Sequence, residues 1–381
     1  MKILHVIPSV SPIYGGPSQA IGSMTSALAA QGLQVDVATT TANGNSELDV
    51  PLSAPVLESG VRTFYFPRQF PKWWTFSWPL TRWLSKNAGN YDLLHIHALF
   101  NYPTLVASQI ARNAKVSYIL RPLGTMSPWS ISQKKLRKKI YYRLFERQNL
   151  FHAAAIHATS HFEARYLQRL GLKAKVHIIP LGIEKTSLPR RQTLSNKPPR
   201  LLFLSRLDAK KGLSLLIQSL ASLSKKGMNA HLTIAGNGNP GYLSQLKEKV
   251  RNLGLVSQVE FVGFVEGEKK TQLFAESDIF VLPSSDENFG LAVAEAMAAG
   301  LPVVVSDQVG ISPEVQEYSA GVVVKCTVDS VKEGLERLII DPELCSKMGK
   351  QGEQLVKERF AWDKVAGQLT EFYEKILSHR V

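Results

Sequence analysis

The chain has 381 residues, of which 44% are hydrophobic and 20% are charged, so it is long enough for two globular domains. No apolar run reaches the roughly 18 residues that a membrane-spanning helix needs, and the first residues read as a short strand, not a signal peptide. Two cysteines, Cys326 and Cys345, make no disulfide framework, which indicates reduced thiols in a cytoplasmic protein.

Charge is spread unevenly along the chain. Residues 1–190 carry 22 Lys and Arg against 8 Asp and Glu, whereas residues 191–381 carry 23 of each kind. The whole formal excess of +14 therefore lies in the first half. Such asymmetry indicates that this half meets an anionic surface or substrate.

Strand-like and helix-like segments alternate along the chain with short connections, which is typical of parallel α/β sheets. In the first half we predict strands over 2–9, 34–40, 61–67, 93–97, 116–120, 155–159 and 176–180, and helices over 17–30, 103–112, 132–150 and 162–170. A basic, proline-containing run over 181–199 reads as a linker. In the second half we predict strands over 200–205, 230–235, 259–262, 279–283, 302–306 and 321–324, with closing helices over 328–340, 342–358 and 362–377.

This pattern predicts two doubly wound, Rossmann-like α/β domains that face a central cleft. In open sheets of this kind, ligands bind outside the carboxyl ends of the strands. The motifs below follow such strand ends.

Two carboxylates lie unusually in the segment over 281–307. Glu287 precedes a helix predicted over 291–299, and Glu295 lies inside it with seven residues between them. Backbone N–H groups at the start of a helix lack intrahelical acceptors, so residues 288–291 can bind an anion. Glu295, in an alanine-rich helix facing a sheet, needs a hydroxyl or cationic partner. The alternative is a solvated surface Glu beside a loop Glu.

The spacing Glu-x7-Glu, followed by Ala296-Met297-Ala298-x-Gly300-x-Pro302-Val303-Val304, resembles the signature of retaining glycosyltransferases of family 4, the group 1 family, which have the GT-B fold. The usual Glu-Gly-Phe-Gly appears here as Glu287-Asn288-Phe289-Gly290, followed by Leu291. The resemblance implies that Glu287 touches the donor sugar and that Glu295 binds the nucleotide ribose. It also implies an acceptor-binding domain over 1–190, a donor-binding domain over 198–361, and a last helix over 362–381 that crosses back to the first domain.

Two further loops carry chemistry that suits phosphate. Gly15 and Gly16 follow the first strand and let the backbone approach a ligand closely, although a simple strand-to-helix turn is the alternative. Arg206 and Lys211 flank the end of another strand, where a guanidinium fork and an ammonium suit a diphosphate. The resemblance assigns Arg206 and Lys211 the stabilisation of the leaving diphosphate, and gives the glycine loop contacts with donor phosphate and acceptor.

The run Gly236-Asn237-Gly238-Asn239-Pro240-Gly241 fits a dinucleotide-binding pattern, but we interpret it as a decoy. Pro240 leaves little room for a helix start there, and no acid ends the following strand to hold a ribose. The family resemblance gives Gly236 and Gly238 a looser role in lining the nucleotide pocket. Phe264 and Val265, which end the next strand, would then flank the base.

Histidines gather on two strands but make a weak metal pattern. His95 and His97 alternate on one strand, and His152, His157 and His161 lie near another, with no carboxylate or Cys completing a set. We therefore predict no metal and no cofactor, and the resemblance likewise implies metal-independent transfer. His97 is a candidate for acceptor binding. Related enzymes often carry a His near residues 121–125; none is present here, and Arg121 is our substitute.

Two stretches account for the basic first half. Residues 134–147 read as a helix with Leu136, Ile140 and Leu144 on one stripe and basic residues on the other faces. Residues 64–83 add several Phe and Trp among basic residues. Together they suit the headgroup region of an anionic membrane, with an ordinary basic helix and core aromatics as the alternative. Nucleic acid is disfavoured because no known binding module is present.

The resemblance implies a retaining glycosyltransferase that moves a hexose from a nucleotide diphosphate sugar to a hydroxyl of a lipid-linked oligosaccharide or polysaccharide precursor. UDP-glucose or UDP-galactose is the favoured donor, and GDP-mannose is the alternative. A non-catalytic sugar-nucleotide-binding protein of the same fold is the other alternative, against which Arg206, Lys211, Glu287 and Glu295 argue. We expect the protein at the inner membrane face.

Overall fold

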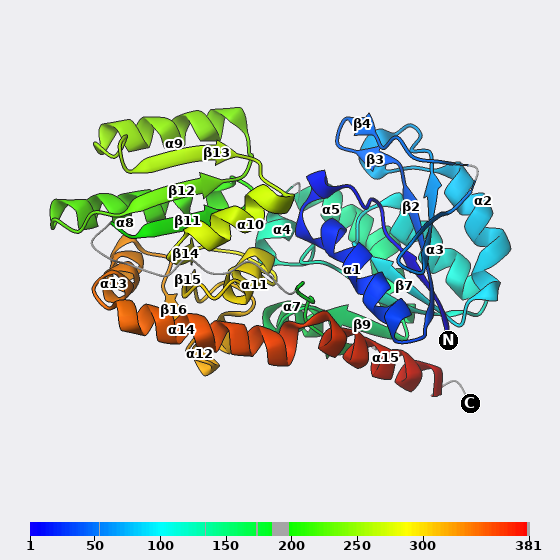
Figure 1. The fold of residues 1–381 in the computed structure, drawn as a ribbon. Coiled ribbons are helices and arrows are strands. Elements are labelled where there is room, and N and C mark those ends of the chain that lie inside the picture. The colour runs from blue at the N-terminus through cyan, green and yellow to red at the C-terminus, as the bar shows by residue number, and fades with distance from the viewer. Residues whose placement is uncertain (53, 134, 173, 185–197, 379–381) are drawn as a thin grey trace. The chain divides into compact units, whose positions relative to one another are not determined.

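The computed structural model describes residues 1–52, 54–133, 135–172, 174–184 and 198–378. Contacts divide the chain into two units, Met1–Gly182 with Trp362–Val381, and Ile183–Ala361. Most of the predicted linker lies outside the described residues. Each unit contains a sheet with helices packed on it, so the prediction of two doubly wound Rossmann-like domains is confirmed (Figure 1).

Among the described residues, the N-terminal unit holds an eight-stranded sheet in the order β10-β9-β8-β7-β1-β2-β6-β5. All neighbours pair in parallel except β5, which runs antiparallel to β6. The strands are β1 (Lys2–Val6), β2 (Gln34–Thr40), β5 (Val56–Glu58), β6 (Val61–Phe66), β7 (Leu93–His97), β8 (Ser117–Arg121), β9 (Ala155–Ala158) and β10 (Lys175–Ile178). A small antiparallel hairpin, β3 (Ala42–Asn43) and β4 (Ser46–Glu47), follows β2.

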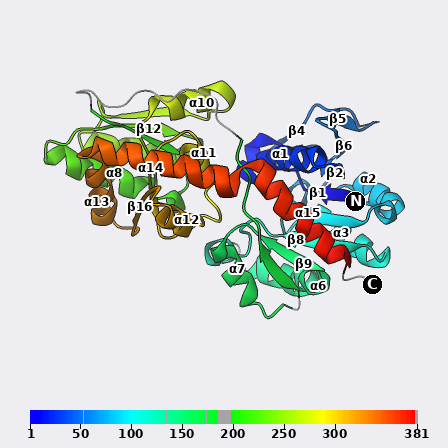
Figure 2. The same ribbon diagram turned by 60° about the horizontal axis from the view of Figure 1, so that its bottom comes forward.

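Helices cover both faces of this sheet. One apolar core joins the sheet to α1 and α15, and a second core joins its opposite face to α2 and α3 (Figure 2). Several helices begin where a Ser or Asn side chain accepts a backbone N–H, as Ser77, Asn101 and Ser160 do. The helices are α1 (Gly16–Ala30), α2 (Trp78–Asn87), α3 (Tyr102–Asn113), α4 (Pro128–Ser132), α5 (Lys135–Tyr141), α6 (Arg147–His152), α7 (His161–Gln168) and α15 (Trp362–Ser378).

The described part of the C-terminal unit holds a six-stranded parallel sheet in the order β13-β12-β11-β14-β15-β16. Its strands are β11 (Arg200–Leu204), β12 (His231–Ala235), β13 (Val259–Gly263), β14 (Ile279–Leu282), β15 (Val303–Ser306) and β16 (Gly321–Val324). Its helices are α8 (Leu213–Lys225), α9 (Pro240–Asn252), α10 (Gly267–Glu276), α11 (Leu291–Ala298), α12 (Ser312–Glu317), α13 (Val328–Ile339) and α14 (Pro342–Leu355). The carboxyl ends of β11 and β14 are neighbours, which brings their loops together.

Two predictions about helices need correction. The single helix expected over 132–150 consists of α4, α5, a π-helical turn at Tyr142–Glu146, and α6. The first of these begins early because Ser127 caps it and Pro128 suits its first turn. Helix α9 does begin at Pro240, where we expected no helix start, because a proline at the first helical position lacks an N–H that would be unpaired anyway. Within the described residues, no helix has the length and apolar character to cross a membrane.

Candidate functional site

The loop after β11 presents three cations at the carboxyl edge of the C-terminal sheet. Arg206 is exposed, and Lys210 and Lys211 lie in a short 3-10 turn that Asp208 caps by accepting the Lys210 N–H at 3.1 Å. Gly212 ends this turn with a φ of 74°, and a Cβ there would lie 2.0 Å from the Pro283 carbonyl oxygen. The glycine therefore lets the loop after β11 approach the loop after β14.

Each lysine of the turn pairs with an acid that follows β14. Lys211 forms an ion pair with Glu287, and Lys210 Nζ lies 3.1 Å from Asp286 Oδ2. The Lys211 and Glu287 side chains are only 9% and 19% exposed. Burial alone would raise the pKa of Glu287, but the positive charges of Lys211, Lys210 and Arg206 outweigh it and hold that pKa below its usual value. Glu287 is therefore an ionised carboxylate among cations.

The loop from β14 into α11 is fixed mainly by its backbone. Glu287 N–H donates to the Gln308 carbonyl at 3.2 Å, and its own carbonyl accepts the Gly310 N–H at 2.9 Å. Gly290, with a φ of 101°, caps α11 without any side-chain capping bond. The Phe289 ring is buried, 5.4 Å from the ring of Phe360, so this side chain belongs to the core, and its predicted donor contact stays a prediction. The start of α11 remains suited to an anion.

Glu295 has the cationic partner that its position demands. Lys270 Nζ, on α10, lies 2.7 Å from Glu295 Oε1, and both side chains are partly exposed. Sequence reasoning did not single out Lys270, because nothing in the spacing of α10 marks which of its lysines faces α11. The predicted contact of Glu295 with a ribose stays a prediction.

The glycine turn after β12 packs against the cation loop. Gly236 has a φ of 134°, and a Cβ there would lie 1.9 Å from the Ser205 carbonyl oxygen. Next to it, Leu207 N–H donates to the Asn237 carbonyl at 2.8 Å, and a Cβ at Gly238 would lie 2.1 Å from the Leu207 carbonyl oxygen. The glycines thus support the loop that holds Arg206, which is a structural role in addition to the predicted lining of a nucleotide pocket.

The predicted base-flanking residues follow the neighbouring strand. Gly236 N–H donates to the Gly263 carbonyl at 2.7 Å, which joins the ends of β12 and β13. Phe264 is exposed and Val265 is half-buried, so an apolar ring lies on the surface beside the glycine turn. An exposed aromatic ring at this edge can stack on a planar base.

In the N-terminal unit, Gly15 and Gly16 lie where the predicted loop meets α1. Gly15 caps α1 with a φ of 89°, and Gly16 is its first residue. Ser11 accepts the Ile13 N–H at 3.4 Å and caps the short 3-10 turn that precedes them.

The candidate acceptor residues His97 and Arg121 lie inside this unit. His97 belongs to a row of histidines with His5, His95 and His157, of which His5 Nδ1 and His97 Nε2 are 3.0 Å apart. Burial, followed by the Arg121 charge, lowers the pKa of His5 to about 3. Arg121 Nη1 lies 3.6 Å from Met24 Sδ. Neither His97 nor Arg121 reaches the surface in this conformation, and their role in acceptor binding stays a prediction.

Ring nitrogens of His5, His95 and His97 all lie within 4.8 Å of one another, so among the described residues they are the cluster with metal-ligand spacing. The spacing of histidines in the sequence does not reveal His5 as a member of this cluster, because His5 lies on β1 whereas His95 and His97 lie on β7. The buried guanidinium of Arg121 beside them opposes a cation, since both charges would share a low-dielectric interior.

Comparison with known proteins gives a consistent identity. Residues 184–355 match the family model described as glycosyl transferases group 1, and residues 15–182 match a glycosyl transferase 4-like domain. A phosphatidyl-myo-inositol mannosyltransferase of Mycobacterium leprae is 26% identical over 394 residues, covering 99% of this chain and 97% of the relative. A GDP-mannose-dependent mannosyltransferase of Mycobacterium tuberculosis is 28% identical over 232 residues, covering 56% of this chain and 60% of the relative.

A solved structure, that of Anabaena HepE in complex with UDP-glucose, superposes with a TM-score of 0.76 at 20% identity, covering 98% of this chain and 100% of HepE. That likeness shows the fold. Taken with the two family models, which together span both units, it confirms the resemblance seen in the motifs. The chain belongs to the group 1 glycosyltransferases, a family of enzymes with the GT-B fold.

Proposed function

We propose that this protein is a retaining glycosyltransferase that transfers a hexose from a nucleotide diphosphate sugar to an acceptor hydroxyl. One observation carries the proposal: Lys211 pairs with Glu287, and the charge of Arg206 also acts on Glu287, at the adjoining ends of β11 and β14. A diphosphate needs cations and N–H groups, whereas a sugar needs a hydrogen-bond acceptor. This edge offers both within one unit.

The roles follow from that chemistry. Arg206, Lys211 and the N-terminus of α11 would stabilise the negative charge that grows on the departing diphosphate. The acceptor hydroxyl would attack the same face of the sugar and give its proton to that diphosphate. Glu287, ionised and held by Lys211, would accept hydrogen bonds from sugar hydroxyls. Glu295, paired with Lys270, would hold the ribose.

UDP-glucose or UDP-galactose is the donor we propose, and a structure of the same fold that contains UDP-glucose supports it. GDP-mannose is the second candidate, because the curated relatives include a GDP-mannose-dependent mannosyltransferase and a phosphatidyl-myo-inositol mannosyltransferase. The proposed acceptor is a hydroxyl of a lipid-linked oligosaccharide or polysaccharide precursor. The supporting observation is that the names of those two relatives include phosphatidylinositol monomannoside and phosphatidyl-myo-inositol.

Calorimetric titration with UDP, GDP and ADP without added metal, followed by the matching sugar nucleotides, tests the donor. We expect UDP to bind more tightly than GDP or ADP. Tight binding of GDP alone would move the assignment to a mannosyltransferase. If the protein binds a nucleotide but releases none from any sugar nucleotide, with or without lipid-linked acceptors, a non-catalytic binding protein is favoured. If it binds no nucleotide at all, the proposal is refuted.

We also propose that the N-terminal unit docks on an anionic membrane surface. The predicted apolar stripe on α5 and the π-helical turn is exposed, whereas an ordinary surface helix would bury it. The Trp-containing segment joins it: Trp74 Nε1 donates to Tyr141 Oη at 3.0 Å, and the Arg137 guanidinium lies 5.0 Å from the Trp73 ring centre. We call the joined set the basic aromatic surface, made of Phe70, Trp73, Trp78, Leu136, Arg137, Lys139, Ile140, Arg143 and Leu144.

Not every predicted basic residue belongs to this surface. Lys138 folds back, with Nζ 2.6 Å from the Ser130 carbonyl oxygen, and Lys134 lies outside the described residues. Arg137, Lys139 and Arg143 are exposed, and each basic residue near an anionic membrane contributes about 1 kcal/mol. The triple change of these three to Gln should therefore weaken binding to phosphatidylglycerol vesicles about 100-fold in co-sedimentation.

A control variant changes Lys225, Arg251 and Lys269, three exposed residues of the other unit, to Gln. It removes the same charge from the chain, so equal losses in both variants would show a net-charge effect in place of a docking surface. Vesicle binding that neither variant changes would contradict membrane docking through these charges.

A further inference from the structure

Arg68 is a buried cation of the N-terminal unit that the proposed chemistry does not use. Its side chain is 4% exposed and follows β6. The guanidinium donates to the Gly44 carbonyl at 2.9 Å, to the Ser46 carbonyl at 2.7 Å, and to Glu47 Oε1 through Nη2 at 2.9 Å and through Nε at 3.1 Å. All these acceptors lie in the β3–β4 hairpin and the turn between its strands. A planar guanidinium with five N–H donors can form these four hydrogen bonds at once, whereas an ammonium has only three N–H donors.

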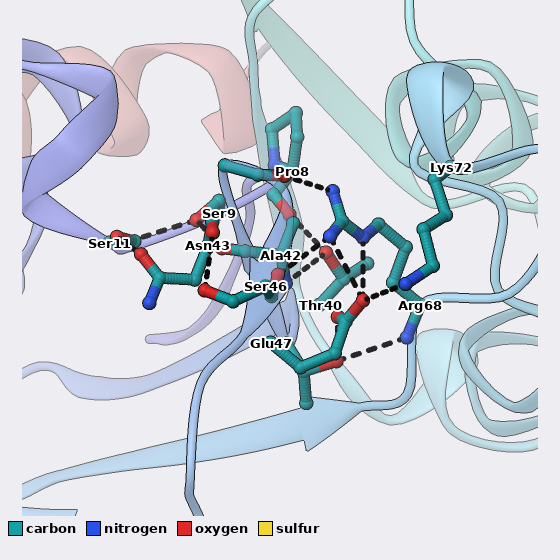
Figure 3. Close-up of polar contacts among 12 residues, drawn as sticks. Pro8, Ser9, Ser11, Thr40, Ala42, Asn43, Ser46, Glu47, Arg68 and Lys72 are labelled. Atoms are coloured by element: carbon teal, nitrogen blue, oxygen red, sulfur yellow. Dashed lines mark hydrogen bonds and ion pairs between the residues drawn. The ribbon is translucent and has the colours of Figure 1, made fainter.

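Glu47 supplies the balancing charge and spreads the contact further. Figure 3 shows Arg68 and Lys72 pointing toward its carboxylate, and Lys72 Nζ lies 3.2 Å from Glu47 Oε1. Thr41 Oγ1 donates to Glu47 Oε2 at 2.9 Å and accepts a hydrogen bond from the backbone N–H of Arg68 at 3.0 Å. The end of β2, the hairpin and the segment after β6 are thereby held as one piece.

The hairpin in turn contacts the loop that leads to Gly15 and Gly16. Ser9 Oγ donates to the Ala42 carbonyl at 2.7 Å, and Ser11 Oγ donates to Asn43 Oδ1 at 2.7 Å (Figure 3). Gly44 N–H donates to Tyr14 Oη at 3.0 Å. Three residues of the glycine loop therefore contact a hairpin whose own shape depends on one guanidinium.

We propose that Arg68 is a positioning residue: through the β3–β4 hairpin it fixes the backbone of the glycine loop, residues 9–16, for substrate. The functional part of this inference rests on the proposed function and on the predicted approach of the Gly15 and Gly16 backbone to donor phosphate and acceptor. Arg68 itself touches no substrate. Its loss should mobilise the loop and slow transfer, with a much smaller effect on nucleotide binding, for which the C-terminal unit supplies the proposed cations.

The test compares Arg68→Gln, Arg68→Lys and Glu47→Gln with Arg62→Gln. Arg62 is a matched control, because it also lies on the β6 segment and forms a two-pronged contact with a carboxylate, to Asp36 at 2.8 and 2.6 Å, at a site away from the hairpin. Hydrogen–deuterium exchange of peptides covering 9–16 reports the loop directly and needs no ligand. We expect at least tenfold faster exchange there in Arg68→Gln, a smaller increase in Arg68→Lys and Glu47→Gln, and none in Arg62→Gln.

The second readout is nucleotide release from UDP-glucose, with the dissociation constant of UDP measured alongside. Arg68→Gln should lower the rate of release 10- to 100-fold and change UDP affinity less than twofold. Unchanged loop exchange in all three Arg68 and Glu47 variants, or equal acceleration in Arg62→Gln, would overturn the inference. If Arg68→Gln does not fold, Arg68→Lys and Glu47→Gln decide it.

If the wild-type protein binds no sugar nucleotide, the proposed function is refuted. That result does not affect the coupling of Arg68 to the loop, because hydrogen–deuterium exchange alone tests it. If hydrogen–deuterium exchange in the loop becomes faster but the rate of nucleotide release is unchanged, Arg68 has only a structural role and its proposed place in the reaction is overturned.

Discussion

Replacing Lys211 by Met tests whether the charge of this lysine acts on the diphosphate or only pairs with a neighbouring acid. Lys211 pairs with Glu287, while the adjacent Lys210 pairs with Asp286. The lysine side chains are 9% and 14% exposed, and both acids are 19% exposed. Lys210→Met is therefore a control that removes the same charge from the same turn at nearly the same burial.

The expected size of the effect follows from these environments. Loss of a donor aimed at a developing oxyanion costs about 100- to 1,000-fold in turnover, or roughly 3 to 4 kcal/mol. Loss of a hydrogen bond to a charged group weakens nucleotide binding by about 1.5–3 kcal/mol, or roughly 10- to 100-fold. Because Lys211→Met also leaves Glu287 without its partner, the free energy of unfolding should fall by about 1–3 kcal/mol. Lys210→Met should change turnover less than about tenfold, as Asp286 is not assigned to substrate.

The assay is release of nucleoside diphosphate from the donor that calorimetry selects, with UDP affinity and denaturant unfolding measured on the same samples. Equal losses of turnover in Lys211→Met and Lys210→Met would refute the assignment, since net charge alone would then explain both. A stability loss in Lys211→Met with normal turnover would make the Lys211–Glu287 pair structural.

Three further outcomes are expected. Glu287→Ala should lower turnover at least 100-fold with little change in nucleotide affinity, because the carboxylate is predicted to face the sugar; an equal loss of nucleotide affinity and of nucleotide release would contradict this. Gly236→Ala should cost about 1–3 kcal/mol in denaturant unfolding, since its φ of 134° disfavours a side chain and the Ser205 carbonyl oxygen lies in the way. Gly254→Ala, which also has a positive φ (71°) but no atom within 4 Å of the added Cβ, is the control for the clash. Burial raises the pKa of Glu146 from 4.5 to about 7, although hydrogen bonds from the Phe100 N–H and Asn149 act in the opposite direction. The folded state therefore keeps the Glu146 proton up to a higher pH than the unfolded state does. The free energy of unfolding of the wild-type protein should therefore fall by up to about 3 kcal/mol as the pH rises from 4.5 to about 7. Glu146→Gln, compared with the wild type by urea unfolding at pH 5 and 8, should lack this fall.

Short buried strands could be predicted closely from the sequence. The strands predicted over 34–40, 93–97 and 321–324 match β2, β7 and β16 residue for residue. Parallel strands covered on both faces are rich in apolar residues, and a short run of this kind between turn or charged residues predicts a strand. The strands predicted over 200–205 and 279–283 placed Arg206, Lys211 and Glu287 after strand ends, and the neighbouring positions of β11 and β14 then brought these residues together.

What the sequence did not reveal depends on contacts between distant residues. The β3–β4 hairpin has no hydrophobic pattern, because hydrogen bonds from Arg68 and Ser9 hold it in place of apolar burial. His97 ends a strand as predicted, and Arg121, expected just after a strand, is the last residue of β8. A strand end does not say which face a side chain takes, and theirs is covered by α1 and α15. Lys270 is recognised as the partner of Glu295 only from the relative positions of α10 and α11 in the fold.

The last helix has a consequence for how the chain is made. Helix α15 completes one core of the N-terminal unit, where Tyr373 Oη lies 2.8 Å from His95 Nδ1, yet about 180 residues of the other unit are synthesised in between. At about 5–20 residues per second, a ribosome needs roughly 10 to 40 seconds to cover that distance. During this time the first unit exposes the apolar face that Val365, Leu369 and Phe372 later cover. The nascent protein therefore carries an unfinished core through about half of its synthesis and depends on its final helix to close it.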